Sequence, residues 1–261
     1  ASANQFVHLV PNNNLGLPID IWLPVTQGIR PLNVTQLSTN LKKVFNDNFS
    51  VQTALFSKFY TNILEHRSGI NLLTGNNWEE ELVSGSGRAY GFESSASFTT
   101  ARFKAIAAYT FCRSRRTIAG INNNREYFSK YDRPHSINVF AHIKLTNASS
   151  IAFNFTYASG NPVSLPTARY VTIVNNEEVV VEQFDEINNY RLPATHHLDV
   201  AYTLNREYRK FNTTLTTGVY NVYNQLNPFM VFIGVGADQQ PTLKLRSYLP
   251  MMPILKYTIH L

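Results

Sequence analysis

The chain ends on Pro253-Ile-Leu-Lys-Tyr-Thr-Ile-His-Leu261. One parity of this stretch is apolar throughout: Leu255, Tyr257, Ile259 and Leu261. The other parity is polar: Lys256, Thr258 and His260. Because successive side chains of a strand point to opposite faces, the stretch predicts an amphipathic strand. Chain termini usually fray, whereas a transmembrane barrel needs a complete last strand to close its ring. The ending therefore favours a membrane barrel, provided that the pattern recurs upstream.

The same alternation recurs along the chain, and no helical period is sustained. A clear case is 136–145, where Ile137, Val139, Ala141, Ile143 and Leu145 share one face. We predict about ten strands, near 3–10, 33–45, 49–64, 88–98, 101–112, 135–145, 150–159, 195–205, 210–235 (with a break allowed) and 241–261.

The gaps between these strands alternate strictly in length. Short gaps lie near 46–48, 99–100, 147–149 and 205–209, and long ones at 11–32, 65–87, 113–134 and 160–194. A β-sandwich has connections of both lengths at both ends. Outer-membrane barrels have tight periplasmic turns and long external loops. The predicted fold class is therefore all-β, a transmembrane antiparallel β-barrel whose last strand runs toward the periplasm.

Composition agrees with this fold. Of 261 residues, 15% are charged, against roughly 25% in soluble domains, while 14 Tyr and 17 Phe are present. The net charge of +6 is mild and its basic clusters are short, so a nucleic-acid surface is disfavoured. The single cysteine, Cys112, excludes an internal disulfide and a cysteine metal site. No apolar run is long enough for a transmembrane helix.

The beginning of the chain, Ala1-Ser2-Ala3-Asn4-Gln5-Phe6, has neither the basic start nor the apolar core of a signal peptide. It leads directly into an expected strand. We expect the chain to be a piece of a longer protein or one chain of a split one.

Short motifs follow one another along nearly the whole chain. They are Leu17–Pro24, Trp78–Glu81, Ser84–Glu93, Tyr109–Ser114, Tyr131–His135, Tyr157–Pro166, Asn189–Pro193, His196–Asp199 and Tyr220–Phe229. Together and in this order they resemble the TonB-dependent outer-membrane receptors, in the form typical of the Bacteroidota. Tyr131-Asp132-Arg133-Pro134-His135, for example, is similar to the family's Y-D-R-R-H, with proline for the second arginine. One departure is the final Leu261, where the family usually ends on an aromatic residue.

The resemblance implies a barrel of about 22 strands, of which residues 1–261 would be the C-terminal part, without the plug domain and the N-terminal strands. Unpaired sheet edges are not viable in lipid, so the missing strands would come from the same precursor or a second chain. It further implies import of a metal chelate, peptide or glycan, energised by the TonB-ExbB-ExbD system. The resemblance implies no cofactor and no covalent chemistry. It does imply contacts with lipid or lipopolysaccharide. Receptors of this family also often pair with a surface lipoprotein.

Seven residues are candidates for ligand binding in loops or lumen: Trp22, Trp78, Arg133, His135, Arg191, His197 and Asp199. His197 and Asp199 share a strand face, but no third ligand has metal-site spacing, so a hydrogen-bonded lumen wall is favoured. Asp132, Arg133 and His135 fit an anchor of ion pairs better than an acid–base set. Trp22 and Trp78 fit ligand stacking and an interfacial girdle equally well. For the strand aromatics Tyr109, Phe111, Tyr157, Tyr220 and Tyr223 the girdle is favoured.

Two other classes stay open: a receptor-like barrel kept as a structural subunit of an envelope complex, and a soluble β-rich binding protein such as a lectin. An enzyme is not expected, because Gly85-Ser86-Gly87 is too short for a nucleophile elbow. The five N-x-S/T sequons are expected by chance in an Asn/Thr-rich chain, and two of them, Asn154 and Asn212, lie in predicted strands.

Overall fold

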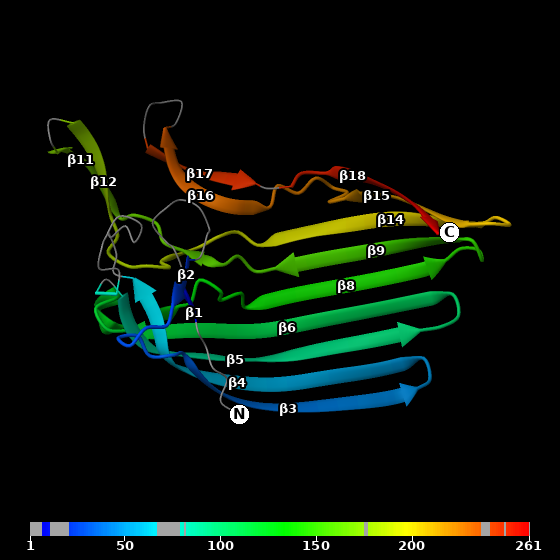
Figure 1. Cartoon of the computed structure of the whole chain (residues 1–261), viewed down its shortest axis with the longest axis horizontal. Helices are drawn as coiled ribbons and strands as arrows, with labels where there is room; N and C mark the ends of the chain where they lie inside the picture. The colour runs from blue at the N-terminus through cyan, green and yellow to red at the C-terminus, as the bar shows by residue number, and fades with distance from the viewer. Residues whose placement is uncertain are drawn as a thin grey trace.

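A computed structural model describes residues 7–10, 21–66, 79–80, 82–174, 177–235, 241–247 and 249–260. One antiparallel sheet of ten strands dominates, and its strands follow the order β18-β15-β14-β9-β8-β6-β5-β4-β3, with short β7 beside β6 (Figure 1). The strands are β3 (Asn33–Asn46), β4 (Phe49–His66), β5 (Leu82–Thr99), β6 (Phe103–Ile118), β7 (Tyr127–Phe128), β8 (His135–Lys144), β9 (Ser149–Ala158), β14 (Thr195–Glu207), β15 (Asn212–Tyr220) and β18 (Met252–His260). The predicted all-β antiparallel sheet of about ten strands is confirmed.

The short connections all lie at one end of this sheet and the long ones at the other (Figure 1). Side chains fix the short turns: the carboxamide oxygen of Asn46 accepts from the amides of Asn48 and Phe49, at 2.9 and 2.8 Å. The hydroxyl of Thr146 does the same for Ala148 and Ser149. Such local side-chain acceptors favour tight turns. We call these two ends the turn end and the loop end; β18 runs to the turn end.

Several boundaries differ from the prediction. β5 begins six residues earlier than expected, at Leu82, and β6 continues to Ile118. The extension of β5 contains Gly85 and Gly87, which have no side chains and so give no alternating pattern in the sequence. Gly85 allows β5 to lie close to β6, since a Cβ there would overlap the Thr117 carbonyl oxygen. Close backbone approach of this kind is a common reason for glycine in a strand.

The predicted strand 241–261 is wrong as one strand. It divides into β17 (Pro241–Ser247) and β18 around Leu249, whose φ of 57° is left-handed, followed by Pro250. Strand 210–235 breaks as allowed, into β15 and β16 (Pro228–Val235). β16 and β17 pair only with each other, as a separate ribbon.

The predicted first strand also needs correction. Of 3–10, the part described is β1 (Val7–Val10), which pairs with β2 (Ile21–Pro24) in a two-stranded sheet and not with the main sheet. The expected loop 160–194 contains a hairpin of β11 (Ala168–Val174) and β12 (Glu177–Gln183), and a short pair of β10 (Pro162–Val163) and β13 (Tyr190–Arg191). No part of the described residues forms a helix long and apolar enough to cross a membrane.

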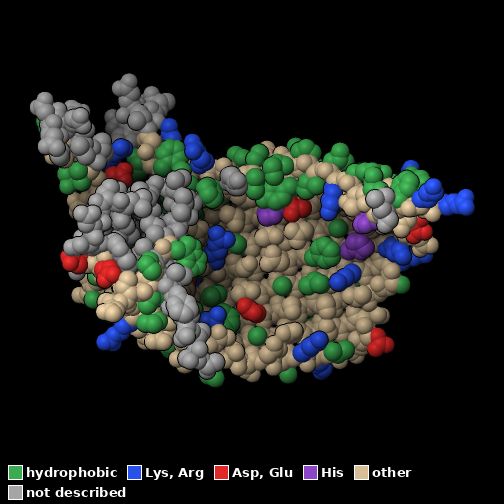
Figure 2. All heavy atoms as spheres, in the orientation of Figure 1, with side chains coloured by type: hydrophobic (Ala, Val, Ile, Leu, Met, Phe, Trp, Pro, Cys, Tyr) green, Lys and Arg blue, Asp and Glu red, His purple; other side chains and the backbone are tan. Residues whose placement is uncertain are grey.

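The two faces of the main sheet differ in chemistry. One row of paired residues across it is mostly polar: Lys42, Gln52, Ser95, Ala108, Asn138, Thr156 and His197. The next row, on the opposite side, is richer in apolar groups: Leu41, Thr53, Ser94, Tyr109, Ile137, Tyr157 and His196. We call these sides the polar face and the apolar face. Figure 2 shows a face with few hydrophobic side chains and scattered charged ones across the middle of the sheet.

The apolar face is uncovered in this chain. Leu37, Leu41 and Leu255 are each about three-quarters exposed, and β18 places Leu255, Tyr257 and Ile259 on this face, as its sequence predicted. Burying such surface is the main favourable contribution to folding in water, so a face like this indicates a non-aqueous neighbour. The strand order ends at β3 and β18; within the described residues the sheet does not close on itself.

Candidate functional site

The loop end carries a small apolar core on the polar face. It consists of Ile63, Ile118, Ile121, Tyr127 and Ile187, all buried. These residues come from β4, β6, β7 and two connecting loops. Asn122 ties two of those loops together, because its amide donates to the Ile187 carbonyl (3.1 Å) and accepts from the Ile187 amide (2.8 Å). The described loop segments are therefore fixed to the sheet by packing and hydrogen bonds.

A buried ion pair lies beside this core. Glu65 accepts from the Arg116 guanidinium at 2.7 Å, and the glutamate side chain is only 2% exposed. The irregularity at Asn62, with φ of 61°, shifts the register of β4 and puts Glu65 on the same face as Arg116. Burial, and then the negative charge of Glu65, raises the pKa of Tyr127 well above its ordinary value. A buried charge needs such a partner, so this pair fixes the loop end of β4 against β6.

A cavity of about 490 Å³ opens on the polar face next to the pair. Its walls mix charged and polar groups, including Lys58, Glu93 and Ser129, with the rings of Tyr60 and Tyr131. A concave region of this mixed character is suited to contact with another chain segment or a polar ligand.

Asp132 is the centre of a second network. Its side chain is fully buried, and its carboxylate accepts from the Ser114 amide at 2.7 Å and from the guanidinium groups of Arg113 and Arg191. Arg191 also donates to the backbone carbonyls of Asp132 (2.6 Å) and Gly160 (2.7 Å). Arg191, expected among the ligand-binding candidates, thus ties its own loop to β6.

Arg133 and His135 do not join this network. Arg133 reaches only the Asn161 side chain, at 3.5 Å, among its described hydrogen bonds. His135 lies on the apolar face, where its Nδ1 is 2.8 Å from the Tyr109 hydroxyl and its ring lies against Phe111. Asp132, Arg133 and His135 therefore do not converge on one point as an acid–base set would, and of the three, Asp132 takes the anchoring role.

His197 and Asp199 form a weak pair on the polar face. The imidazole Nε2 is 3.6 Å from the carboxylate. Asp199 also accepts from the Asn154 side chain (3.3 Å) and the Asn221 amide (3.0 Å), while the His197 ring lies against Tyr220. No group of three His, Cys, Asp or Glu side chains that would hold a metal occurs among the described residues. The arrangement matches a hydrogen-bonded wall.

Of the two tryptophans, only Trp22 is among the described residues. Trp22 lies in β2 and is 64% exposed; Trp78 is outside the described residues. The six described candidates are distributed over separate places, and a common ligand site of the seven residues stays a prediction.

Aromatic rings gather at both ends of the main sheet. The turn-end belt contains Phe45 against Phe49, Phe98 against Phe103, and Tyr208 against Phe211. The loop-end belt contains Phe92, Tyr109, Phe111 and His135. Two such belts at the edges of an apolar band are typical of residues at the two interfaces of a bilayer. Of the strand aromatics expected in a girdle, Tyr109 and Phe111 lie in the loop-end belt, whereas the ring of Tyr220 packs on His197 of the polar face.

One cluster was missed by sequence reasoning. Arg88, Arg113 and Arg115 lie on the apolar face just beyond the loop-end belt, around Glu126 and Phe128. In the sequence, Arg113-Ser114-Arg115-Arg116 was visible only as a short basic cluster. The alternation of β6, continued through this cluster, would have placed Arg113 and Arg115 on one face.

Comparison with known proteins bears on the fold. No model of a known protein family matches the chain, and no curated protein matches its sequence. Among solved structures, it is similar to the ferric-catecholate import receptor Fiu of E. coli K12 in its closed form, with a TM-score of 0.54 and 15% sequence identity. The similarity covers 90% of this chain and 29% of the receptor chain. The ten-stranded sheet therefore has the fold of part of a receptor barrel, and the chain spans less than a third of that receptor's length.

Proposed function

We propose that this chain is the C-terminal part of the barrel of a TonB-dependent receptor in a bacterial outer membrane. The observation that carries the proposal is the two-faced sheet, with an apolar face between two aromatic belts and a polar face opposite. A membrane barrel needs this arrangement, since its outside meets lipid and its inside meets water or protein. The similarity to an import receptor supports the same assignment.

The apolar face of β5 between Phe98 and Tyr90 is close in length to the apolar band of an outer-membrane barrel. Along β5, Phe98 belongs to the turn-end belt and Phe92 to the loop-end belt, and Tyr90 follows beyond it on the same face. From Phe98 to Tyr90 the strand covers about 27 Å at ~3.4 Å per residue. A tilt of roughly 40° reduces this to about 20 Å, close to the ~25 Å apolar band of outer-membrane barrels.

The complete receptor would need further strands at the edges of β3 and β18, from the same precursor or a second chain, together with a plug. The polar face and its 490 Å³ cavity would then contact the plug from one side. Ligand import would draw energy from the TonB-ExbB-ExbD system, and the ligand would be a metal chelate, a peptide or a glycan. The Bacteroidota form of the receptor, and a surface lipoprotein as partner, rest on the sequence motifs alone.

The test is ligand uptake by cells that carry the complete receptor. Cells are supplied with ferric catecholate, haem, peptide or oligosaccharide as the only source of the nutrient concerned. We expect growth on at least one of them that is lost when TonB is deleted and restored when it is returned. Recovery of the protein outside the outer-membrane fraction, or growth that is independent of TonB on every nutrient, would contradict the proposal.

A further inference from the structure

The polar face carries four lysines within four residues of the turn end, one each on β3, β6, β8 and β18. They are Lys42, Lys104, Lys144 and Lys256. All four side chains are exposed. Figure 2 shows blue and purple side chains gathered toward this end of the face. We call these four residues the lysine strip.

The lysine strip has little negative charge to balance it. Within the same distance of the turn end, Glu207 of β14 is the one carboxylate that the described strands place on the polar face. In the described part of the chain, no salt bridge joins a lysine of the strip to another residue. Four positive charges therefore stand against one negative charge, and the potential over this end of the polar face is positive.

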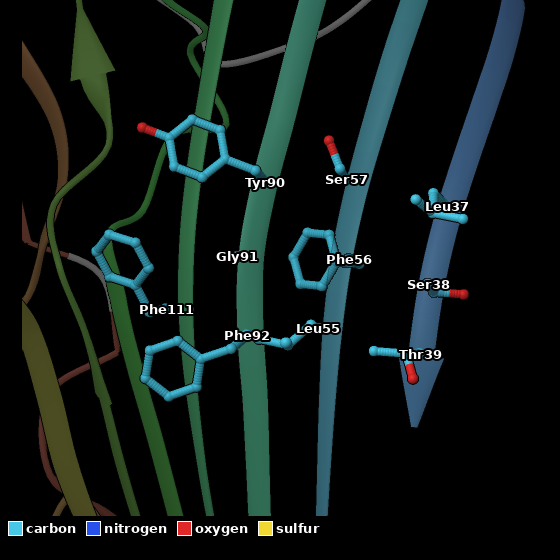
Figure 3. Close-up of a pocket in the computed structure, with 10 residues that line it drawn as sticks. All are labelled: Leu37, Ser38, Thr39, Leu55, Phe56, Ser57, Tyr90, Gly91, Phe92 and Phe111. Carbon is cyan, nitrogen blue, oxygen red and sulfur yellow. The ribbon is translucent and has the colours of Figure 1, made fainter. Parts of the chain in front are cut away.

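The remainder of the polar face has the opposite balance, with two cations and three carboxylates on the described strands. They are Lys58, Arg116, Glu65, Glu93 and Asp199. Arg116 is neutralised by Glu65 in the buried pair. The Lys58 ammonium lies over the Phe56 ring, 5.6 Å from its centre, and Figure 3 shows this ring extending from β4 toward Gly91 of β5. The charge of the polar face thus changes along the strands, from slightly negative near the loop end to positive near the turn end.

The lysine strip extends across much of the sheet. Lys144 and Lys256 belong to one row of paired residues, and the residues between them in that row are Ser150, Thr203 and Thr216. Four spacings between neighbouring strands separate the two lysines by about 19 Å along the sheet, at ~4.8 Å per spacing. The strip is therefore a broad positive surface and not one closed pocket. Several weak contacts of this kind let a charged ligand both enter and leave, as in the lining of selective channels.

We propose that the lysine strip attracts a ligand with several negative charges and favours its passage toward the turn end, so that the ligand imported by the receptor is an anion. Charge complementarity carries the assignment, because a surface lined by one sign of charge raises the local concentration and the association rate of ligands of the opposite sign. In the proposed membrane orientation the turn end faces the periplasm, so the change of charge along the polar face directs an anion inward. The inference rests on the proposed function and narrows its ligand classes to their anionic members.

The test compares the uptake of matched probes by cells that carry the complete receptor and no other receptor for these compounds. The three pairs are an anionic ferric tris-catecholate and a neutral ferric trihydroxamate, a sulfated oligosaccharide and the same oligosaccharide without sulfate, and an oligoglutamate and an oligoglutamine of equal length. We expect TonB-dependent uptake of the anionic member of at least one pair, about tenfold or more faster than that of its neutral partner. The pair that is transported distinguishes a metal chelate, a glycan and a peptide.

Charge variants of the strip connect this selectivity to the lysines. Lys144→Gln combined with Lys256→Gln should slow uptake of the anionic probe about fivefold or more, at an unchanged amount of receptor in the outer membrane. Lys144→Arg combined with Lys256→Arg keeps both charges and should retain uptake. The matched control, Lys43→Gln with Arg206→Gln, removes two cations of the apolar face near the same end and should retain uptake as well.

Three results would overturn the inference: uptake of the neutral member at least as fast in every transported pair, undiminished uptake by the double glutamine variant, or loss of uptake in the double arginine variant. The first result, if that uptake depends on TonB, removes only the anion assignment and leaves the receptor function in place. Absence of TonB-dependent uptake of all six probes would contradict the proposed function too.

Discussion

Asp132 shows what a single buried carboxylate does at the loop end. It is fully buried and joins β6, its own loop and β13 through Ser114, Arg113 and Arg191. Removing one partner of a buried ion pair leaves the other charges uncompensated. The stability of the loop end should therefore depend more on Asp132 than on its charged sequence neighbour Arg133.

Replacement of Asp132 by alanine should lower the free energy of unfolding by about 3–5 kcal/mol. Arg133→Ala is the matched control, because the one hydrogen bond of the Arg133 side chain within the described part of the chain is long, at 3.5 Å; its effect should stay within about 0.5 kcal/mol. Equilibrium unfolding in detergent, with limited proteolysis of the loops, measures both. Equal effects of the two variants would show that the carboxylate network is not what fixes the loops.

Glu126 makes the loop end sensitive to acid. Burial opposes its ionisation, but the hydrogen bonds from Arg115 and Arg88 outweigh burial and lower its pKa below the ordinary 4.5. A carboxyl group with a depressed folded-state pKa adds stability above its unfolded-state pKa, and this stability is lost as pH falls through the folded-state pKa. The contribution should be complete above about pH 4.5.

We therefore expect proteolysis of the 119–134 loop to accelerate as pH falls below about 4.5. Glu126→Gln should make the rate higher at neutral pH and flatten its pH dependence, because the glutamine cannot ionise. Proteolysis by an acid-active protease and by one active at neutral pH, with an unrelated peptide as the rate standard, provides the measurement. An unchanged pH profile in the glutamine variant would rule out Glu126 as the sensor.

For single residues, the sequence predicts which face some side chains occupy but does not predict the contacts between distant loops. The residues that β18 places on the apolar face can be predicted from side-chain alternation alone, because Leu255, Tyr257 and Ile259 are spaced two residues apart. The Asp132–Arg191 pair joins residues far apart in sequence, and alternation says nothing about such loop contacts. Glu65 could not be assigned to a face, because the register shift at Asn62 reverses the parity of β4.

Among the elements, β5 has its closest backbone approach to β6 at Gly91. A Cβ at Gly91 would overlap the carbonyl oxygen of Phe111 on β6. Backbone this close leaves no room for a side chain, and the neighbouring strand cannot move away without breaking the ladder of hydrogen bonds.

Gly91→Ala should therefore impair assembly of the sheet. The expected result is a loss of most heat-modifiable, folded protein from the outer-membrane fraction, seen as a shift on unheated gels. Gly120→Asn serves as the control, since Gly120 has open space and a φ of 79°, a conformation that asparagine tolerates. Normal assembly of the Gly91 variant would show that the β5–β6 spacing can relax.

The elements themselves were predicted unevenly, for identifiable reasons. β8 and β9 alternate from end to end and were placed within a residue or so. The sequence predicts β17 and β18 as one strand, because the apolar residues Tyr248, Leu249, Met251 and Met252 continue across the break between them. The sequence predicts a loop where the β11–β12 hairpin lies, since its seven-residue strands fall in a long interval between sheet strands.

On the scale of the whole molecule, the sheet is open where a membrane barrel must be closed. The order ends at β3 and β18, and an unpaired edge in lipid leaves backbone groups without partners. The comparison with the import receptor, of which the chain matches 29%, agrees with a larger wall. Alternation and gap lengths predict the sheet and its two ends, but the side-chain pattern of a strand carries no information on which strand pairs with the edges of β3 and β18.

The central claim is that the apolar face meets lipid and the polar face does not. Spin labels placed singly at 254–259 of β18 in the assembled receptor, with Cys112 replaced by serine, test it most directly. We predict collision with oxygen, which concentrates in lipid, to be high at Leu255, Tyr257 and Ile259 and low at Lys256 and Thr258, with a period of two. Contact with a water-soluble nickel reagent at both parities, or the absence of any alternation, would contradict the account.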